Sequence, residues 1–255
     1  MKKIIIFLCA VLLCNPVFSA DTKIYNAGAD VSQASIIMPY KDISKKWRTI
    51  NKMKKQTRQL SEEDKSVIKK YVFGAVRGED TYLLINCHLR GVLEHYIPKK
   101  EITTPLKCRL DYYANALSKP ISKVKLPQNM ILYRGIDEKG IKLIFKGKGI
   151  DSIVSKPVNE NNLALLQQKL DGAVYVENGF MSTSYKKDCA KKTKFMLEVN
   201  APKNLQAVLL EDIGKQVEKE VLINRGTKWE VTDIYIDSDT KSKCTFYVIK
   251  VKFLK

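Results

Sequence analysis

The pattern of apolar residues changes near Pro127, and this change limits the folds open to the 255-residue chain. Before Pro127, apolar residues recur at helical spacing in segments that begin at Ser61, Asp80 and Thr104. Ser61 has a hydroxyl that can cap free amides, and three acidic residues follow it, where they favour the positive end of a helix dipole. The first half of the chain is therefore predicted to be mainly helical.

After Pro127, short runs rich in Val, Ile, Leu, Phe and Tyr predict strands at 130–135, 195–199, 207–211, 220–224, 228–236 and 245–254. A short helical pattern over 163–170 stops at Gly172. Helices first and strands later, without regular βαβ units, indicate an α+β fold with antiparallel or mixed sheets. We expect residues of about 21–125 to be mainly helical and about 126–255 to form a β-rich core.

The extreme N-terminus has the features of a secretory signal peptide. Two lysines precede an unbroken apolar stretch over residues 4–13, and Pro16 and small residues follow. The apolar run is too short to span a bilayer, which argues against a membrane anchor. We expect export, cleavage after Ser19 or Ala20, and a single domain over 21–255 with no stable membrane insertion.

Cysteine usage and charge limit the possible partners. Cys87, Cys108, Cys189 and Cys244 remain after cleavage and lack zinc-site spacing, so no metal is expected. In an oxidising compartment they allow up to two disulfides in three pairings, or four free thiols, and the sequence does not choose. The formal net charge is +18, but the lysines are scattered, so we expect no nucleic-acid partner.

Three short elements offer chemistry, each of which has an ordinary structural explanation when taken alone. Arg134 and Gly135 lie on a predicted strand, where a guanidinium could bind phosphate through paired hydrogen bonds. The hydroxyl run 182–184 could orient a carboxylate or a ligand. Glu218 and Glu220 would point to one side of an extended strand, since residues i and i+2 share a face.

Arg on a strand, then Ser-Thr-Ser, then Glu-x-Glu, in that order, resembles the R-S-E class of bacterial mono-ADP-ribosyltransferase toxins, which includes the catalytic components of clostridial binary toxins. Agreement extends over about residues 60–255 and includes the stretches 60–63, 85–91, 126–135 and 218–226. The resemblance implies an ADP-ribosyltransferase-like fold, in which a helical N-terminal part packs on a core of two mixed or antiparallel sheets. It also implies that NAD⁺ is a substrate.

The resemblance implies a role for each residue that matches the family pattern on the NAD⁺ side. Arg134, with Gly135 beside it, corresponds to the arginine that holds the NAD⁺ phosphates. Ser182 corresponds to the serine that hydrogen-bonds the catalytic carboxylate, and Thr183 and Ser184 shape the NAD⁺ pocket.

The two glutamates match the family's catalytic pair. Glu220 corresponds to the catalytic glutamate, which engages the nicotinamide ribose and stabilises positive charge as the glycosidic bond opens. Glu218 corresponds to the glutamate that orients and activates the acceptor. In this family, Glu-x-Glu accompanies arginine acceptors, so the implied partner is a host protein with an acceptor arginine. Actin is the first target to test. The enzyme is expected to act as a monomer.

Two departures from the family pattern affect the acceptor and the nicotinamide. Lys215 stands where related toxins usually have an aromatic residue that contacts the target. The segment after Ser184 lacks the expected Phe and Arg, so Tyr185 is expected to pack against nicotinamide instead. Two other functions remain open at this point: an NAD⁺ glycohydrolase, in which water is the acceptor, and a secreted basic binding protein without turnover.

Overall fold

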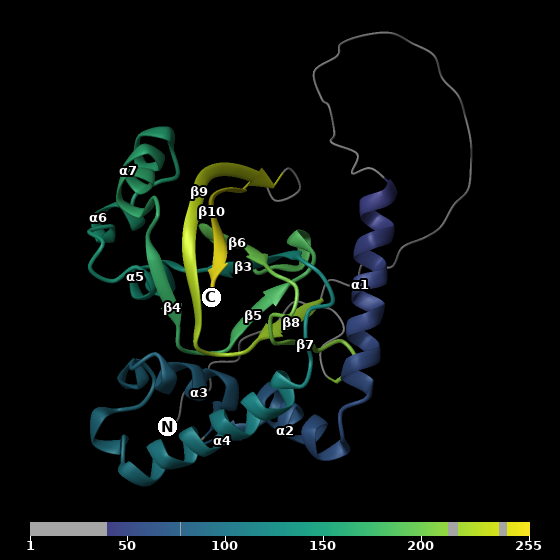
Figure 1. Cartoon of the computed structure of the whole chain (residues 1–255). Helices are drawn as coiled ribbons and strands as arrows, with labels where there is room; N and C mark the ends of the chain where they lie inside the picture. The colour runs from purple at the N-terminus through teal and green to yellow at the C-terminus, as the bar shows by residue number, and fades with distance from the viewer. Residues whose placement is uncertain (1–39, 77, 214–218, 240–243) are drawn as a thin grey trace, which may run out of the picture. The chain divides into compact units, whose positions relative to one another are not determined.

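The computed structural model describes residues 40–76, 78–213, 219–239 and 244–255, with side chains from residue 45 onward. The chain divides into two units, Met1–Met38 and Pro39–Lys255, and all described residues belong to the second. The expected signal peptide and its cleavage site lie outside the described residues. In Figure 1 the helices α1–α4 lie in the early, purple-to-teal part of this unit, and most strands of a large sheet lie in its later, green-to-yellow part.

The helices predicted from the sequence are present, and one of them, α2, begins at the expected capping residue. The helical part comprises α1 (Tyr40–Arg58), α2 (Glu62–Phe73), α3 (Thr81–Leu89), α4 (Thr104–Ser122) and the short 3₁₀ turns η1 (Leu93–His95) and η2 (Lys99–Glu101). The Ser61 hydroxyl accepts a hydrogen bond from the Asp64 amide at 3.1 Å, and α3 follows Asp80. The third of the predicted helices, α4, includes Pro120 and continues to Ser122.

One mixed sheet contains eight strands in the order β4-β9-β10-β6-β3-β5-β8-β7. Its strands are β3 (Met130–Ile136), β4 (Val174–Glu177), β5 (Met181–Ser184), β6 (Phe195–Ala201), β7 (Ala207–Leu209), β8 (Glu220–Ile223), β9 (Thr227–Asp239) and β10 (Cys244–Leu254). Only β6 and β10 are parallel among the described neighbours. A separate two-stranded ribbon joins β1 (Ala75–Val76) to β2 (Glu79–Asp80).

The family resemblance implied two separate sheets, and strand β3 joins them into one. It pairs with β6 over its whole length, from Met130–Ala201 to Ile136–Phe195. On its other side it meets β5 at one residue pair, Tyr133–Ser184. The α+β class is confirmed, and the two expected sheets are continuous through this narrow junction.

Three helices between β3 and β4 complete the unit: α5 (Glu138–Ile144), α6 (Asp151–Val154) and α7 (Glu160–Leu170). Only α7 was predicted, as the pattern that stops at Gly172. The strand β4 was missed as well, since four residues are too few to show alternation.

The core has two main hydrophobic clusters, which lie on opposite faces of the sheet. One places apolar residues of α1 and α5–α7 against the strands, with the fully buried Trp229 of β9 among them. The other places α2–α4 against β7, β8 and the start of β5. In β8, Val221 and Ile223 join the first cluster and Leu222 joins the second. By the same alternation, Glu220 faces the helices α2–α4.

Candidate active site

A cavity of about 710 Å³ opens between the helical part and the sheet. The helices α2 and α3 and the turn η1 line one side, and β3, β5 and the first residue of β8 line the other. This cavity brings together six residues that the sequence singled out: Arg134, Gly135, Ser182, Thr183, Ser184 and Glu220. They come from three strands that are far apart in the chain, so the fold gathers them into one candidate site.

The pairing of β5 with β8 places the hydroxyl run beside Glu220. Ser184 lies directly opposite Glu220, and Ser182 lies two residues along the same strand and therefore on the same face. The Thr183 hydroxyl donates to the carbonyl of Val221 at 2.6 Å, which fixes the two strands together. Glu220 is 8% exposed, so its carboxylate works in a largely dry environment.

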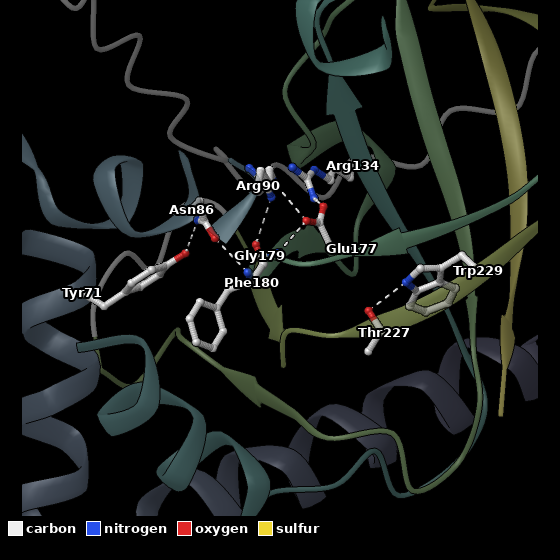
Figure 2. A network of polar contacts seen from close by, with 9 residues as sticks. All are labelled: Tyr71, Asn86, Arg90, Arg134, Glu177, Gly179, Phe180, Thr227 and Trp229. Carbon is white, nitrogen blue, oxygen red and sulfur yellow. Dashed lines mark hydrogen bonds and ion pairs between the residues drawn. The ribbon is translucent and has the colours of Figure 1, made fainter. Parts of the chain in front are cut away.

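Glu177 is the central residue of the site that sequence reasoning missed. Its carboxylate accepts hydrogen bonds from Arg90 Nε at 2.8 Å and from Arg134 Nη1 at 3.0 Å (Figure 2). The Gly179 amide donates to the same carboxylate at 2.9 Å. Glu177 ends β4, four strands from β3, a separation of about 19 Å in a flat sheet. The ion pair therefore requires a strongly curled sheet.

At this cluster, charge pairing affects the pKa values of the ionisable groups more than burial does. Glu177 is 3% exposed, and burial by itself would raise the pKa of its carboxyl. The guanidiniums of Arg134 and Arg90 and the Gly179 amide overcome that effect and leave the pKa of Glu177 below its ordinary value. Burial would likewise lower the pKa of Arg90, but Glu177 raises it, so the pair stays ionised.

A second network, also drawn in Figure 2, fixes α3 to the strand β5. The Asn86 side chain donates to the Tyr71 hydroxyl at 2.8 Å and accepts from the Phe180 amide at 2.8 Å. A Cβ atom on Gly179 would lie 2.7 Å from Asn86 Oδ1 and 3.0 Å from Arg90 Nε, so a larger residue there would displace these two side chains. The stretch 85–91, part of the family resemblance, thus supplies both Asn86 and Arg90 to the site.

Gly135 permits another segment of the backbone to approach β3 closely, and the approaching group is the carbonyl of Lys191. A Cβ atom at Gly135 would lie 1.7 Å from that oxygen. The segment between β5 and β6 is therefore seated directly on β3. Its residues Cys189, Ala190 and Lys191 line the cavity.

Tyr185, expected to pack against nicotinamide, lies elsewhere. Its ring is 7% exposed in the hydrophobic core, and it is not among the described residues that line the cavity. Its hydroxyl donates to Glu211, a buried carboxylate that also pairs with Lys54 at 2.8 Å and with Lys219 at 3.3 Å. The apolar neighbours of the ring hold it in the core, so this structure gives it a supporting position behind the site.

The other sequence expectations fall partly outside the described residues. Glu218 and Lys215 belong to the segment 214–218, which the structure does not describe. Cys87, Cys108, Cys189 and Cys244 form no disulfide with one another. His88 contacts Asp111 Oδ1 at 2.8 Å, whereas His95 lines the cavity.

The described residues show neither a metal site nor a helix that could cross a membrane. They contain no group of three or more His, Cys, Asp or Glu side chains arranged to hold a metal. None of their helices combines the length and apolar character that a membrane crossing requires.

Comparison with known proteins gives the family. A family model for the ADP-ribosyltransferase exoenzymes matches residues 44–254. Among solved structures, Plx2a, an ADP-ribosyltransferase toxin from Paenibacillus larvae, is 22% identical with a TM-score of 0.63, over 84% of this chain and 96% of that one. C3stau2 from S. aureus, solved with NAD, is 20% identical with a TM-score of 0.63, over 84% of this chain and 96% of that one.

A larger toxin component shares the same fold. The enzymatic component C2-I of the C2 toxin from Clostridium botulinum is 19% identical with a TM-score of 0.61, and 82% of this chain matches 47% of it. A search of curated proteins gave no match. Because the family model covers most of the sequence, the resemblance is confirmed: this chain belongs to the ADP-ribosyltransferase exoenzyme family.

Proposed function

We propose that this chain is an exported toxin that transfers ADP-ribose from NAD⁺ to an arginine of a host protein and releases nicotinamide. Membership of the family makes it a mono-ADP-ribosyltransferase with NAD⁺ as its substrate. The observation that carries the proposal is the convergence of Arg134, Ser182, Ser184 and Glu220 on one cavity. Export, the arginine acceptor and actin as the first target to test belong to the proposal.

The two guanidiniums of the cavity suit the diphosphate of NAD⁺. Each guanidinium carries five N–H donors in a planar fork, and Glu177 takes only part of them. The buried carboxylate fixes Arg90 and Arg134 in place and leaves the three side chains together with a net charge of +1. A site with this residual charge and fixed donors favours a phosphate group.

Glu220 has the position and burial that charge stabilisation needs. Bound NAD⁺ supplies the glycosidic bond to nicotinamide, whose departure leaves positive charge on the ribose. A carboxylate held in a dry site stabilises that developing charge more than it stabilises the ground state. Ser182 and Ser184, on the same face of the paired strands, are assigned to orient it.

Glu218 is assigned to the acceptor. It precedes Glu220 by two residues, and a carboxylate can bind a guanidinium through paired hydrogen bonds and help to remove its proton. Under this assignment Glu220 acts on the sugar, and Glu218 acts on the arginine.

The experiment that tests the proposal replaces Glu220 with Gln, which keeps the size and removes the charge. Nicotinamide release and transfer of labelled ADP-ribose to agmatine, a small guanidine acceptor, should both fall at least about a hundredfold. NAD⁺ affinity and thermal unfolding should change little, since the charge acts on the transition state. Near-normal turnover by a folded Glu220→Gln protein would contradict the proposal.

A further inference from the structure

The outward side of α1 carries positive charge that no described residue neutralises. Between residues 45 and 58 the chain has seven basic residues and no acidic one. Lys45, Arg48, Lys52 and Lys55 recur at spacings of three and four, so they share one face of the helix, here called the α1 cationic face. All four are exposed, and within the described part of the chain no ion pair is recorded for them.

Two other cations of α1 bind carboxylates at the start of the connection between β7 and β8. Lys54 pairs with Glu211 at 2.8 Å, and Arg58 Nε pairs with Asp212 Oδ2 at 2.8 Å. Glu211 and Asp212 begin the connection between β7 and β8, along which Glu218 lies in the sequence. The helix is thus fixed to the start of this connection, beside the β7 edge of the sheet (Figure 1).

A groove lies at this place on the surface. It has a volume of about 630 Å³ and is lined by Asn51, Lys54, Lys55, Arg58 and Gln59. Its lining combines basic side chains and amides, all of which donate hydrogen bonds to carboxylates. Neighbouring like charges on a helix also repel one another, and this destabilises the helix. An acidic partner would reduce this repulsion, which the described residues do not relieve.

We propose that the α1 cationic face and its groove dock an acidic segment of the acceptor protein, and thereby deliver its arginine to the site. This inference rests on the proposed arginine transfer and adds a chemical class of target to it. Complementary charge speeds encounter and selects among partners, so proteins with an arginine near an acidic tract are preferred acceptors. Agmatine and water are too small to reach the face, and their reactions do not depend on it.

The test uses synthetic peptides with one arginine, joined by spacers of several lengths to a tract of Asp and Glu, and matched peptides in which Asn and Gln replace that tract. For the full chain we expect the KM of the best acidic peptide to be at least tenfold lower than that of its neutral match. Raising the salt concentration should reduce this difference, since the charges are exposed.

Charge reversal at the face provides the critical variant. The triple variant R48E/K52E/K55E should lose the preference for acidic peptides while retaining NAD⁺ hydrolysis and transfer to agmatine. The matched control K146E/K148E/K156E changes the net charge equally at three other exposed lysines and should keep the preference. A preference that survives in the first variant, or is lost equally in the control, overturns the inference.

Other outcomes separate this inference from its premise and from a competing partner. Equal KM values for acidic and neutral peptides, with active transfer to agmatine, overturn the docking inference alone. Failure of the full chain to modify any arginine, including agmatine, overturns the proposed function itself. Binding of phosphatidylserine vesicles that R48E/K52E/K55E abolishes, with an unchanged peptide preference, assigns the face to an anionic membrane instead.

Discussion

At the scale of single residues, Glu177 determines how both guanidiniums of the cavity are held. It is almost fully buried, and its partners are Arg90, the residue that follows α3, and Arg134 of β3. Removing one member of a buried ion pair leaves uncompensated charge behind, which costs more than the pair contributes. Glu177 therefore links the stability of the fold to the geometry of the proposed phosphate site.

Replacing Glu177 with Gln should lower the free energy of unfolding by about 3 kcal/mol at pH 7. Because the native pKa of Glu177 is below its ordinary value, its stabilising effect is present above the unfolded-state pKa and is lost as the pH falls through the native pKa. Urea unfolding from pH 7 to pH 3 should show a deficit that shrinks toward acid. A deficit of the same size at every pH would contradict the ion-pair account.

A second substitution at this scale separates the two glutamates. Glu218→Gln should strongly reduce transfer of ADP-ribose to arginine peptides yet leave much of the NAD⁺ hydrolysis, because water needs little positioning by this carboxylate. The ratio of the two rates measures the effect. A parallel fall would place Glu218 in the NAD⁺ machinery and remove the main support for an arginine acceptor. If neither rate fell, the Glu-x-Glu pair would be an ordinary strand feature.

Sequence reasoning identified the residues that occur in short motifs and missed those that act through remote partners. Arg134, the hydroxyl run 182–184 and Glu220 were found from local patterns, and all line the cavity. Glu177 sits in an ordinary strand, and only the curl of the sheet brings it to Arg134, which one sequence cannot reveal. Tyr185 was expected at nicotinamide because it follows the motif, but alternation and apolar neighbours direct it into the core.

At the scale of elements, β3 is the junction of the sheet and the support for the segment that follows β5. Gly135→Ala would place a methyl group against the Lys191 carbonyl, and backbone cannot swing aside as a side chain can. We expect the free energy of unfolding, measured by chemical denaturation, to fall by about 2 kcal/mol. We also expect weaker NAD⁺ binding, measured by calorimetry.

Gly147→Ala is the control for that substitution. Gly147 has a φ of +81° and no atom within 4 Å of an added Cβ, so only local backbone strain is expected and NAD⁺ affinity should persist. If Gly135→Ala bound NAD⁺ as well as this control, the seating of Lys191 on β3 would have no bearing on the site.

The helix α1 contributes to the fold through Lys54. Lys54→Met keeps the length of the side chain but leaves Glu211 with Lys219 and Tyr185 alone, and should cost about 1–2 kcal/mol in unfolding free energy. Lys55→Met, on the exposed side of the same helix, should change stability by less than about 0.5 kcal/mol. Equal effects would show that the Lys54–Glu211 pair adds nothing measurable.

Helices and strands with clear local signals were predicted well, and their ends less well. Ser61 gave the start of α2 because a capping hydroxyl acts within one turn. The helix α4 continues through Pro120, which removes a single backbone donor, and ends two residues later at Ser122. We expected two sheets and the structure has one. The single β3–β5 contact that joins them, at Tyr133 and Ser184, produces no local pattern in the sequence.

At the scale of the whole molecule, the α+β class followed from the order of helical and strand patterns, and the family followed from the order of three motifs. Order along a chain is visible in a sequence, whereas the angle between elements is not. The net charge of +18 was interpreted from the sequence as scattered solvated lysines. The described structure shows in addition that part of this charge is concentrated along α1.

The central claim is that this chain joins ADP-ribose from NAD⁺ to an arginine of a host protein. Incubation of the full chain with labelled NAD⁺ and host-cell lysate, followed by mass spectrometry of the labelled proteins, tests it most directly. The account predicts ADP-ribose on arginine side chains and no label with Glu220→Gln. Label on asparagine or glutamine side chains, or NAD⁺ consumption without any labelled protein, would contradict it.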